Sequence, residues 1–131
     1  MRTIKNLILV LFMAFFIYEA KSQSIPREIV TATQNGNATD LAKFFNDKVE
    51  VILPSKSGVY SKEQAQFVMA DFFTSNRPTS FQINHEGKRD NSSYAICSYV
   101  SSKEKFRFYF LTKSIDNKTV IIQIRIDKQD D

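Results

Sequence analysis

His85 is the residue whose type and position come closest to acid–base chemistry. It is the only histidine in the 131 residues, and an imidazole is the side chain that ordinarily titrates near neutral pH. From Thr79 onward alternate residues share a face, so His85 is predicted to lie with Phe81 and Ile83 and to point toward the helices. A general base needs a desolvated pocket of that kind. A structural histidine at the open end of a sheet, hydrogen-bonded or half-exposed, fits the same pattern, and the sequence leaves both readings open.

Other reactive residue types are scarce or badly placed for catalysis. Glu50 follows the alternation of a strand and is expected to face outward, while Asp71 lies at the margin of an apolar helix face. Cys97 is the only cysteine and lies among apolar strand residues, where a buried and inert thiol is expected. With one cysteine and one histidine, the sequence favours neither a structural metal site nor a cofactor, and no catalytic triad is suggested by position.

A second candidate site is a surface on the last strands of the chain. Several aromatic, aliphatic and arginine side chains are predicted to share the outward face of these strands, a mixture typical of contact surfaces. A partly wet sheet face with stacked side chains is the alternative. The residues assigned to this face are Tyr99, Arg107, Tyr109, Leu111, Ile121, Gln123 and Arg125. From them, Tyr99, Arg107 and Tyr109 join His85 as candidate binding residues.

The first 22 residues have the pattern of a cleavable secretory signal peptide. Arg2 and Lys5 form a basic start, and residues 7–18 form an unbroken apolar run. That run is shorter than the roughly 20 apolar residues of a spanning helix, which argues against a retained anchor. Cleavage is predicted between Ser22 and Gln23. The protein is therefore expected to be exported, either to the periplasm or outside the cell.

Residues 23–131 are expected to form one domain. Removing residues 1–22 leaves 15 Lys and Arg against 13 Asp and Glu, a net charge of +2 instead of the +4 of the whole chain. Such a balance, with no large basic cluster, gives no support to nucleic acid or to an anionic membrane as the partner after signal removal. The length suits a modest core without a second domain.

The remaining pattern predicts an α+β fold, with the element order α-α-β-α-β-β-β-β. Ser61 and Gln64 form a capping box that opens the longest helix. A turn is expected at residues 55–58. Period-two alternation then continues to the C-terminus, which predicts a four-strand antiparallel meander in a curved sheet. The predicted helices are 24–35, a short one capped by Asn37, and 61–75, and the predicted strands are 49–53, 79–86, 94–100, 106–111 and 120–126.

This order of elements resembles the cone-shaped nuclear transport factor 2-like superfamily, which is cystatin-like in the broader sense of the fold. Six segments also resemble a family of exported bacterial proteins, domain of unknown function family 4783. These segments are IPREIV (25–30), GNATDLAKFFNDKVEVILP (36–54), YSKEQAQFVMADFF (60–73), FQINHEG (81–87), KFRFYF (105–110) and IIQIRID (121–127).

The resemblance implies two ways in which such a cone is used. Enzymes of the superfamily place a base inside the cone, which implies a small isomerase or dehydratase with His85 in that role. The convex sheet face is a common dimer surface, which implies a homodimer. Because no catalytic constellation is visible, the sequence favours a non-catalytic module that binds a small ligand or a protein.

Overall fold

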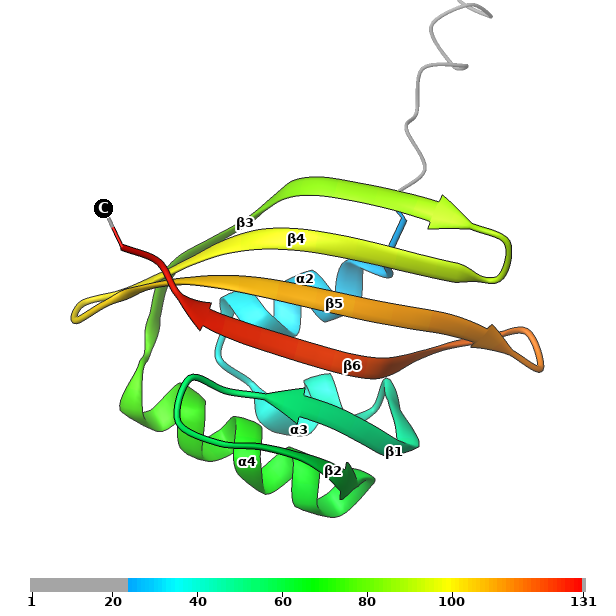
Figure 1. Ribbon diagram of the computed structural model, residues 1–131, viewed down its shortest axis with the longest axis horizontal. Helices are drawn as coiled ribbons and strands as arrows, with labels where there is room; N and C mark the ends of the chain where they lie inside the picture. Colours follow the sequence, from blue (N-terminus) through cyan, green and yellow to red (C-terminus); the bar gives the residue numbers. More distant parts are fainter. Residues whose placement is uncertain (1–23, 131) are drawn as a thin grey trace, which may run out of the picture.

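Residues 24–130 are described by the computed structural model, and they follow the predicted order of elements with one strand added. The fold class is α+β, as predicted. Helices α2 and α3 lie behind the curved sheet in the view of Figure 1, and α4 lies along its lower side. The elements are α2 (Arg27–Gln34), α3 (Ala38–Ala42), β1 (Phe45–Ile52), β2 (Ser57–Ser61), α4 (Lys62–Ser75), β3 (Pro78–Arg89), β4 (Ser92–Ser101), β5 (Lys105–Ile115) and β6 (Lys118–Lys128).

The sheet has six strands in the order β2-β1-β6-β5-β4-β3. Strands β3 to β6 form the predicted antiparallel meander. Strand β1 joins the meander through a parallel pairing with β6, which is the one parallel pairing in the described sheet. The added strand, β2, occupies part of the predicted turn. The turn is tighter than expected, because the Leu53 N–H donates to the Lys56 carbonyl at 2.8 Å, and the chain then pairs back along β1.

Helix α4 begins at the predicted capping box. The Ser61 hydroxyl accepts from the Gln64 N–H at 3.2 Å, and the Gln64 side chain accepts from the Ser61 N–H at 3.1 Å. These two bonds satisfy donors that the first turn of a helix cannot satisfy internally. The buried face of α4 consists of Ala65, Met69, Phe72 and Phe73, which places the helix against the inner side of the sheet.

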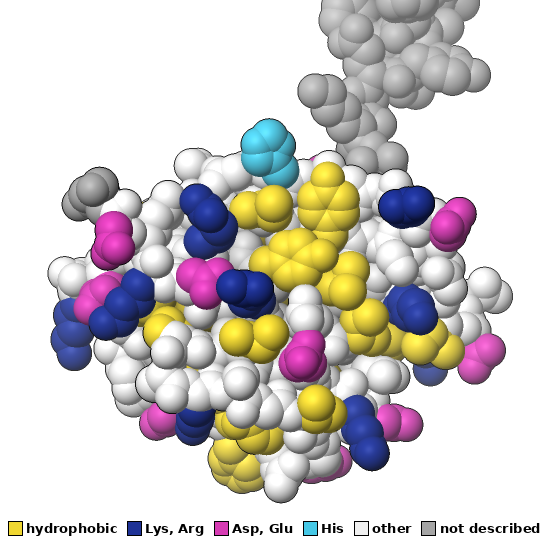
Figure 2. Space-filling view, viewed as in Figure 1, with side chains coloured by type: hydrophobic (Ala, Val, Ile, Leu, Met, Phe, Trp, Pro, Cys, Tyr) yellow, Lys and Arg dark blue, Asp and Glu magenta, His cyan; other side chains and the backbone are white. Residues whose placement is uncertain are grey.

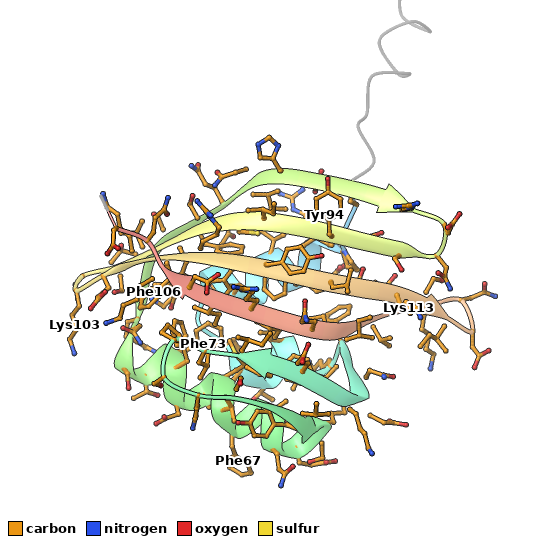
Figure 3. The ribbon with its side chains drawn as sticks, in the orientation of Figure 1. Phe67, Phe73, Tyr94, Lys103, Phe106 and Lys113 are labelled. Carbon is orange, nitrogen blue, oxygen red and sulfur yellow. The ribbon has the colours of Figure 1, made fainter. Side chains whose placement is uncertain are left out.

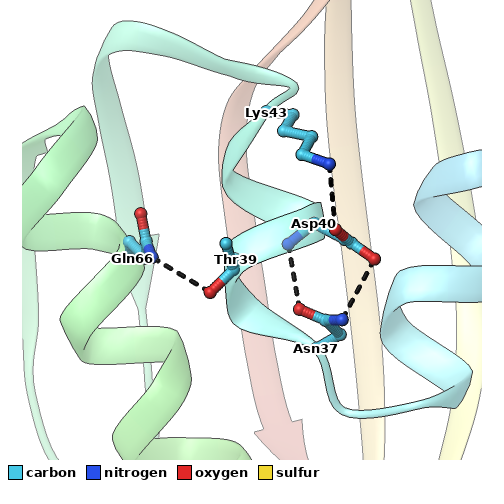
Figure 4. Close-up of polar contacts among 5 residues, drawn as sticks. All are labelled: Asn37, Thr39, Asp40, Lys43 and Gln66. Atoms are coloured by element: carbon cyan, nitrogen blue, oxygen red, sulfur yellow. Dashed lines mark hydrogen bonds and ion pairs between the residues drawn. The ribbon is translucent and has the colours of Figure 1, made fainter.

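Helix α3 is held by polar contacts at its start (Figure 4). The Asp40 N–H donates to Asn37 Oδ1 at 3.0 Å, and Asn37 Nδ2 donates to Asp40 Oδ2 at 3.0 Å. Lys43 Nζ lies 3.1 Å from Asp40 Oδ1. Gln66 Nε2 of α4 donates to Thr39 Oγ1 at 3.3 Å. Asn37 therefore caps α3 as predicted, and α3 and α4 are joined by a side-chain bond as well as by their buried faces.

The space between the sheet and the helices is filled by aromatic rings. Neighbouring centroids in this cluster lie 4.7 to 6.4 Å apart, in edge-to-face, tilted and stacked arrangements, which is the preferred range for aromatic pairs. No helix within residues 24–130 combines the length and the apolar character needed to cross a membrane. The aromatic cluster consists of Phe72, Phe73, Phe81, Tyr99, Phe106, Phe108 and Phe110.

Candidate functional site

His85 lies on the outer face of the sheet, the face turned away from the helices. Ile83 pairs with the buried Cys97, whereas His85 pairs with the outward Ile96, so that Asn84 is an extra residue in β3. A bulge of this kind moves every later side chain of the strand to the other face. The prediction that His85 points toward the helices is therefore wrong. Its imidazole is exposed at the outer surface (Figure 2).

The prediction that Tyr99 lies on the outward face is also wrong. It is fully buried in the aromatic cluster, and its hydroxyl donates a hydrogen bond to the Asn76 carbonyl at the end of α4. Burial raises the pKa of the Tyr99 phenol, and the nearby Arg77 guanidinium partly offsets that effect. Tyr99 is thus a structural residue that fastens the end of α4 to the sheet.

Cys97 is buried with a free thiol, as predicted. Burial raises its pKa to about 12, and the Glu86 carboxylate acts in the same direction. Since the thiolate is the reactive form, this cysteine is poorly suited to nucleophilic chemistry.

Arg107 and Tyr109 lie on the outer face as predicted, because Phe106, Phe108 and Phe110 take the inward positions of β5. Tyr109 stacks on Tyr94 of the neighbouring strand, with ring centroids 6.4 Å apart and an angle of 22° between the planes. The Tyr94 ring lies over Gly87, where an added Cβ would come within 2.7 Å of it. Gly87 therefore leaves room for the Tyr94 ring, which is labelled in Figure 3.

Two aliphatic residues extend this aromatic pair. Ile96 lies between His85 and Tyr109 across the strands, and Leu111 is the cross-strand partner of Tyr94. Figure 2 shows hydrophobic side chains gathered at the middle of this face. Tyr94 is 37% exposed, and the other three are partly exposed. We call Tyr94, Ile96, Tyr109 and Leu111 the outer-face patch. Ile121, which was expected in this surface, is buried instead.

Charged residues of both signs surround the outer-face patch. Arg125 is the cross-strand neighbour of Tyr109, and its Nε lies 3.0 Å from Asp127 Oδ2. Gln123 is the neighbour of Leu111 and donates to the Glu50 carboxylate. Arg107 completes the set on β5. An apolar centre with a mixed polar rim is the usual anatomy of a protein–protein interface.

The space between the sheet and the helices is smaller than the ligand pocket that the resemblance to cone-shaped proteins implied. A crevice of about 510 Å³ lies at the end of α4, and its lining includes Phe72, Phe106 and the Glu104–Lys128 ion pair, whose charged atoms are 3.2 Å apart. The aromatic cluster fills the space behind these two rings. Within residues 24–130, no group of three or more His, Cys, Asp or Glu side chains is arranged to hold a metal ion.

Comparison with known proteins identifies the family. The family model described as Domain of unknown function (DUF4783) matches residues 26–127. The chain belongs to this family. A DUF4783 protein from Bacteroides ovatus is 36% identical, with 84% of this chain and 100% of that chain aligned at a TM-score of 0.80. One from Bacteroides uniformis is 38% identical, with 82% and 99% aligned at a TM-score of 0.78.

More distant structures extend the likeness to the fold. An NTF2-like protein of unknown function from Shewanella baltica is 9% identical, with 80% of this chain and 88% of that chain aligned at a TM-score of 0.63. This DUF4783 chain therefore has the NTF2-like fold that the resemblance implied. A comparison with the curated proteins gave no match.

The structure adds two residues to the site of this DUF4783 protein that the sequence reading missed. Tyr94 and Ile96 complete the outer-face patch, yet β4 has apolar residues on both faces, so alternation could not separate them from Ala95 and Cys97. The sequence does contain one indication that Tyr94 faces outward. A glycine at position 87, across the predicted turn from Tyr94, permits an aromatic ring to lie over the backbone.

Proposed function

We propose that this DUF4783 protein is an exported, non-catalytic binding module whose outer-face patch binds a second copy of the same chain. The observation that carries the proposal is the exposed Tyr94–Tyr109 stack, flanked by Ile96 and Leu111. Contiguous exposed apolar surface with a polar rim is characteristic of interaction sites in soluble proteins. Tyrosine and arginine, together with tryptophan, are enriched among the residues that contribute most to binding at such interfaces.

The rim favours a second copy as the partner. In a two-fold symmetric pair each surface must complement itself, so a rim that carries both signs is suitable, and a rim of one sign would repel its copy. Arg107 and Arg125 supply positive charge, and Glu50 and Asp127 supply negative charge. A partner of uniform charge, such as nucleic acid, finds no matching field on this face.

Two observations weigh against the alternative of an isomerase or dehydratase. That alternative needs His85 as a base inside the cone, but His85 lies on the other side of the sheet. The space in which a substrate would lie is packed with aromatic rings. We therefore assign His85 to the margin of the outer-face patch, next to Ile96, as a contact residue.

Export is the second part of the proposal, and its support is the sequence of residues 1–22. These residues and the expected cleavage between Ser22 and Gln23 lie outside the described residues. The basic start, the apolar run and the small residues Ala20 and Ser22 are the pattern that signal peptidase accepts.

The pairing is tested by sedimentation velocity over a range of protein concentration. The purified protein is expected to sediment as a dimer. Tyr109→Glu places a charge in the centre of the outer-face patch, and loss of a central aromatic contact should weaken pairing by about 30-fold or more. Ile115→Glu is the matched control, because Ile115 is an exposed apolar residue of the same strand outside the patch. A monomeric parent protein, or equal weakening by both variants, would contradict the proposal.

A further inference from the structure

The two edge strands of the sheet, β2 and β3, differ in how their free backbone groups are protected. On β3, Gln34 Nε2 of helix α2 donates to the Phe81 carbonyl at 3.3 Å. The strand also begins with Pro78, contains the bulge at Asn84 and ends with Lys88 and Arg89. Proline, bulges and lysine are among the devices by which natural sheets prevent edge pairing.

Strand β2 has none of these devices within its five residues, Ser57–Ser61. Its register shows which backbone groups are free. Because Leu53 and Lys56 are hydrogen-bonded across the turn, the bonded pairs that follow in an antiparallel ladder are Val51 with Gly58 and Val49 with Tyr60. Val59, opposite Glu50, is then in a non-bonded pair, so its N–H and C=O point away from β1.

The capping box of α4 supports this assignment. Ser61 is two residues after Val59 and has the same orientation, and its N–H is the donor that Gln64 accepts. The N–H therefore faces outward, as the ladder requires. One outward donor of β2 is thus used within the protein, while Val59 presents a donor and an acceptor side by side at the edge.

Two exposed apolar side chains lie on this side of the molecule, one on β2 and one on α4. Val59 is 65% exposed and Phe67 of α4 is 77% exposed, the two largest exposures among the large hydrophobic residues of the described chain. Phe67 projects from α4 at the lower rim of the molecule, where β2 is the outermost strand (Figure 3). A strand added to β2 could place apolar side chains against both residues.

The charge around β2 is mainly positive. Lys56 and Lys62 immediately precede and follow the strand, and Lys48 is the cross-strand neighbour of Ser61. The nearby acids are Glu63, at the start of α4, and Glu50, which already accepts from Gln123. An acidic segment therefore complements the two ends of this edge better than a basic one.

We propose that the β2 edge binds an extended segment of another protein, a short strand with apolar residues in its middle and acidic residues at its ends. The main-chain bonds to Val59 hold the segment in register, and Val59 and Phe67 receive its side chains, which is recognition by strand addition. The proposal does not depend on pairing through the outer-face patch, because the segment binds at an edge of the sheet and contacts Val59 and Phe67, which are not part of that patch.

The test uses a fluorescein-labelled peptide, Asp-Thr-Val-Val-Val-Thr-Asp, which has apolar side chains on both faces at its middle, and fluorescence anisotropy with the full protein. Val59→Pro removes the outward N–H without removing a bond to β1. Val59→Thr keeps the N–H and the branched shape and is the matched control. Loss of one main-chain bond together with the steric clash of the ring should weaken binding by about tenfold, whereas the threonine variant should stay within about twofold of the parent.

Two further measurements keep the result interpretable. Phe67→Ser should weaken binding several-fold, and a peptide with lysine in place of both aspartates should bind more weakly than the acidic one. If Val59→Pro does not fold, NMR titration of the parent protein replaces it, and the largest shifts should then fall at Val59 and Phe67. Absence of saturable binding by the parent protein, or shifts confined to the outer-face patch, would overturn the proposal.

Discussion

Truncating Phe108 tests the arrangement of the core, because this ring touches more of the aromatic cluster than its neighbours on β5. Phe108 is 0% exposed. Its centroid lies 4.7 Å from Tyr99 in a nearly parallel stack, and 5.6 to 5.9 Å from Phe72, Phe81 and Phe110. Phe108→Ala removes all four ring contacts and leaves a cavity that a sheet strand cannot readily close.

A buried Phe→Ala change lowers the free energy of unfolding by about 3–5 kcal/mol, and the four ring pairs place Phe108 near the upper end. That loss is a large share of the roughly 5–15 kcal/mol that stabilises a domain of this size. Lys113→Ala is the control on the same strand, at an exposed position outside the outer-face patch and its rim, and it should change the free energy by about 0.5 kcal/mol or less.

The assay is urea unfolding followed by far-UV circular dichroism, which is appropriate because the chain has no tryptophan. Phe108→Ala should lower the midpoint strongly with little change in slope, since the slope reports the surface exposed on unfolding. Equal effects of the two substitutions would refute the packing of β5 described above.

The remaining predictions concern the buried thiol and the N-terminus. Burial raises the pKa of Cys97 to about 12 from its ordinary 9.0, so the native protein should resist thiol reagents at pH 8 and react only on unfolding. Between pH 9 and 12 the unfolded chain loses the thiol proton and the native chain keeps it. The free energy of unfolding should therefore fall as the pH rises, by at most about 1.4 kcal/mol per pH unit. A Cys97→Ala variant whose free energy of unfolding falls equally steeply with pH would contradict this. Intact mass of the exported protein should correspond to a chain that begins at or within a few residues of Gln23, and full-length protein in the membrane fraction would contradict cleavage.

Periodicity predicted most of the fold because most elements bury one face only. The alternation of Phe106, Phe108 and Phe110 with Arg107 and Tyr109 separates the two faces of β5 without ambiguity, and the structure agrees. Helix α4 was predictable for the same reason, since its capping box and its apolar arc indicate the start and the buried side independently.

The errors come from places where alternation is interrupted or does not distinguish the two faces, and from one strand with little strand propensity. The bulge at Asn84 reverses the face of His85, and a second bulge at Ile122 places Ile121 inside. Neither bulge has a glycine or proline to mark it in the sequence. Tyr99 was misassigned because β4 is apolar on both faces, so that only the tertiary packing decides which face is inner. Strand β2 was missed because five residues with two serines and a glycine carry little strand propensity.

Intermolecular nuclear Overhauser effects can show whether two copies meet through the outer-face patch. A mixture of isotope-labelled and unlabelled protein reports only contacts between copies. We expect effects from the rings of Tyr94 and Tyr109 to the side chains of Ile96 and Leu111 in the other copy. Intermolecular effects that arise only from residues of α2, α3 or α4, or none at concentrations where the protein sediments as a dimer, would contradict it.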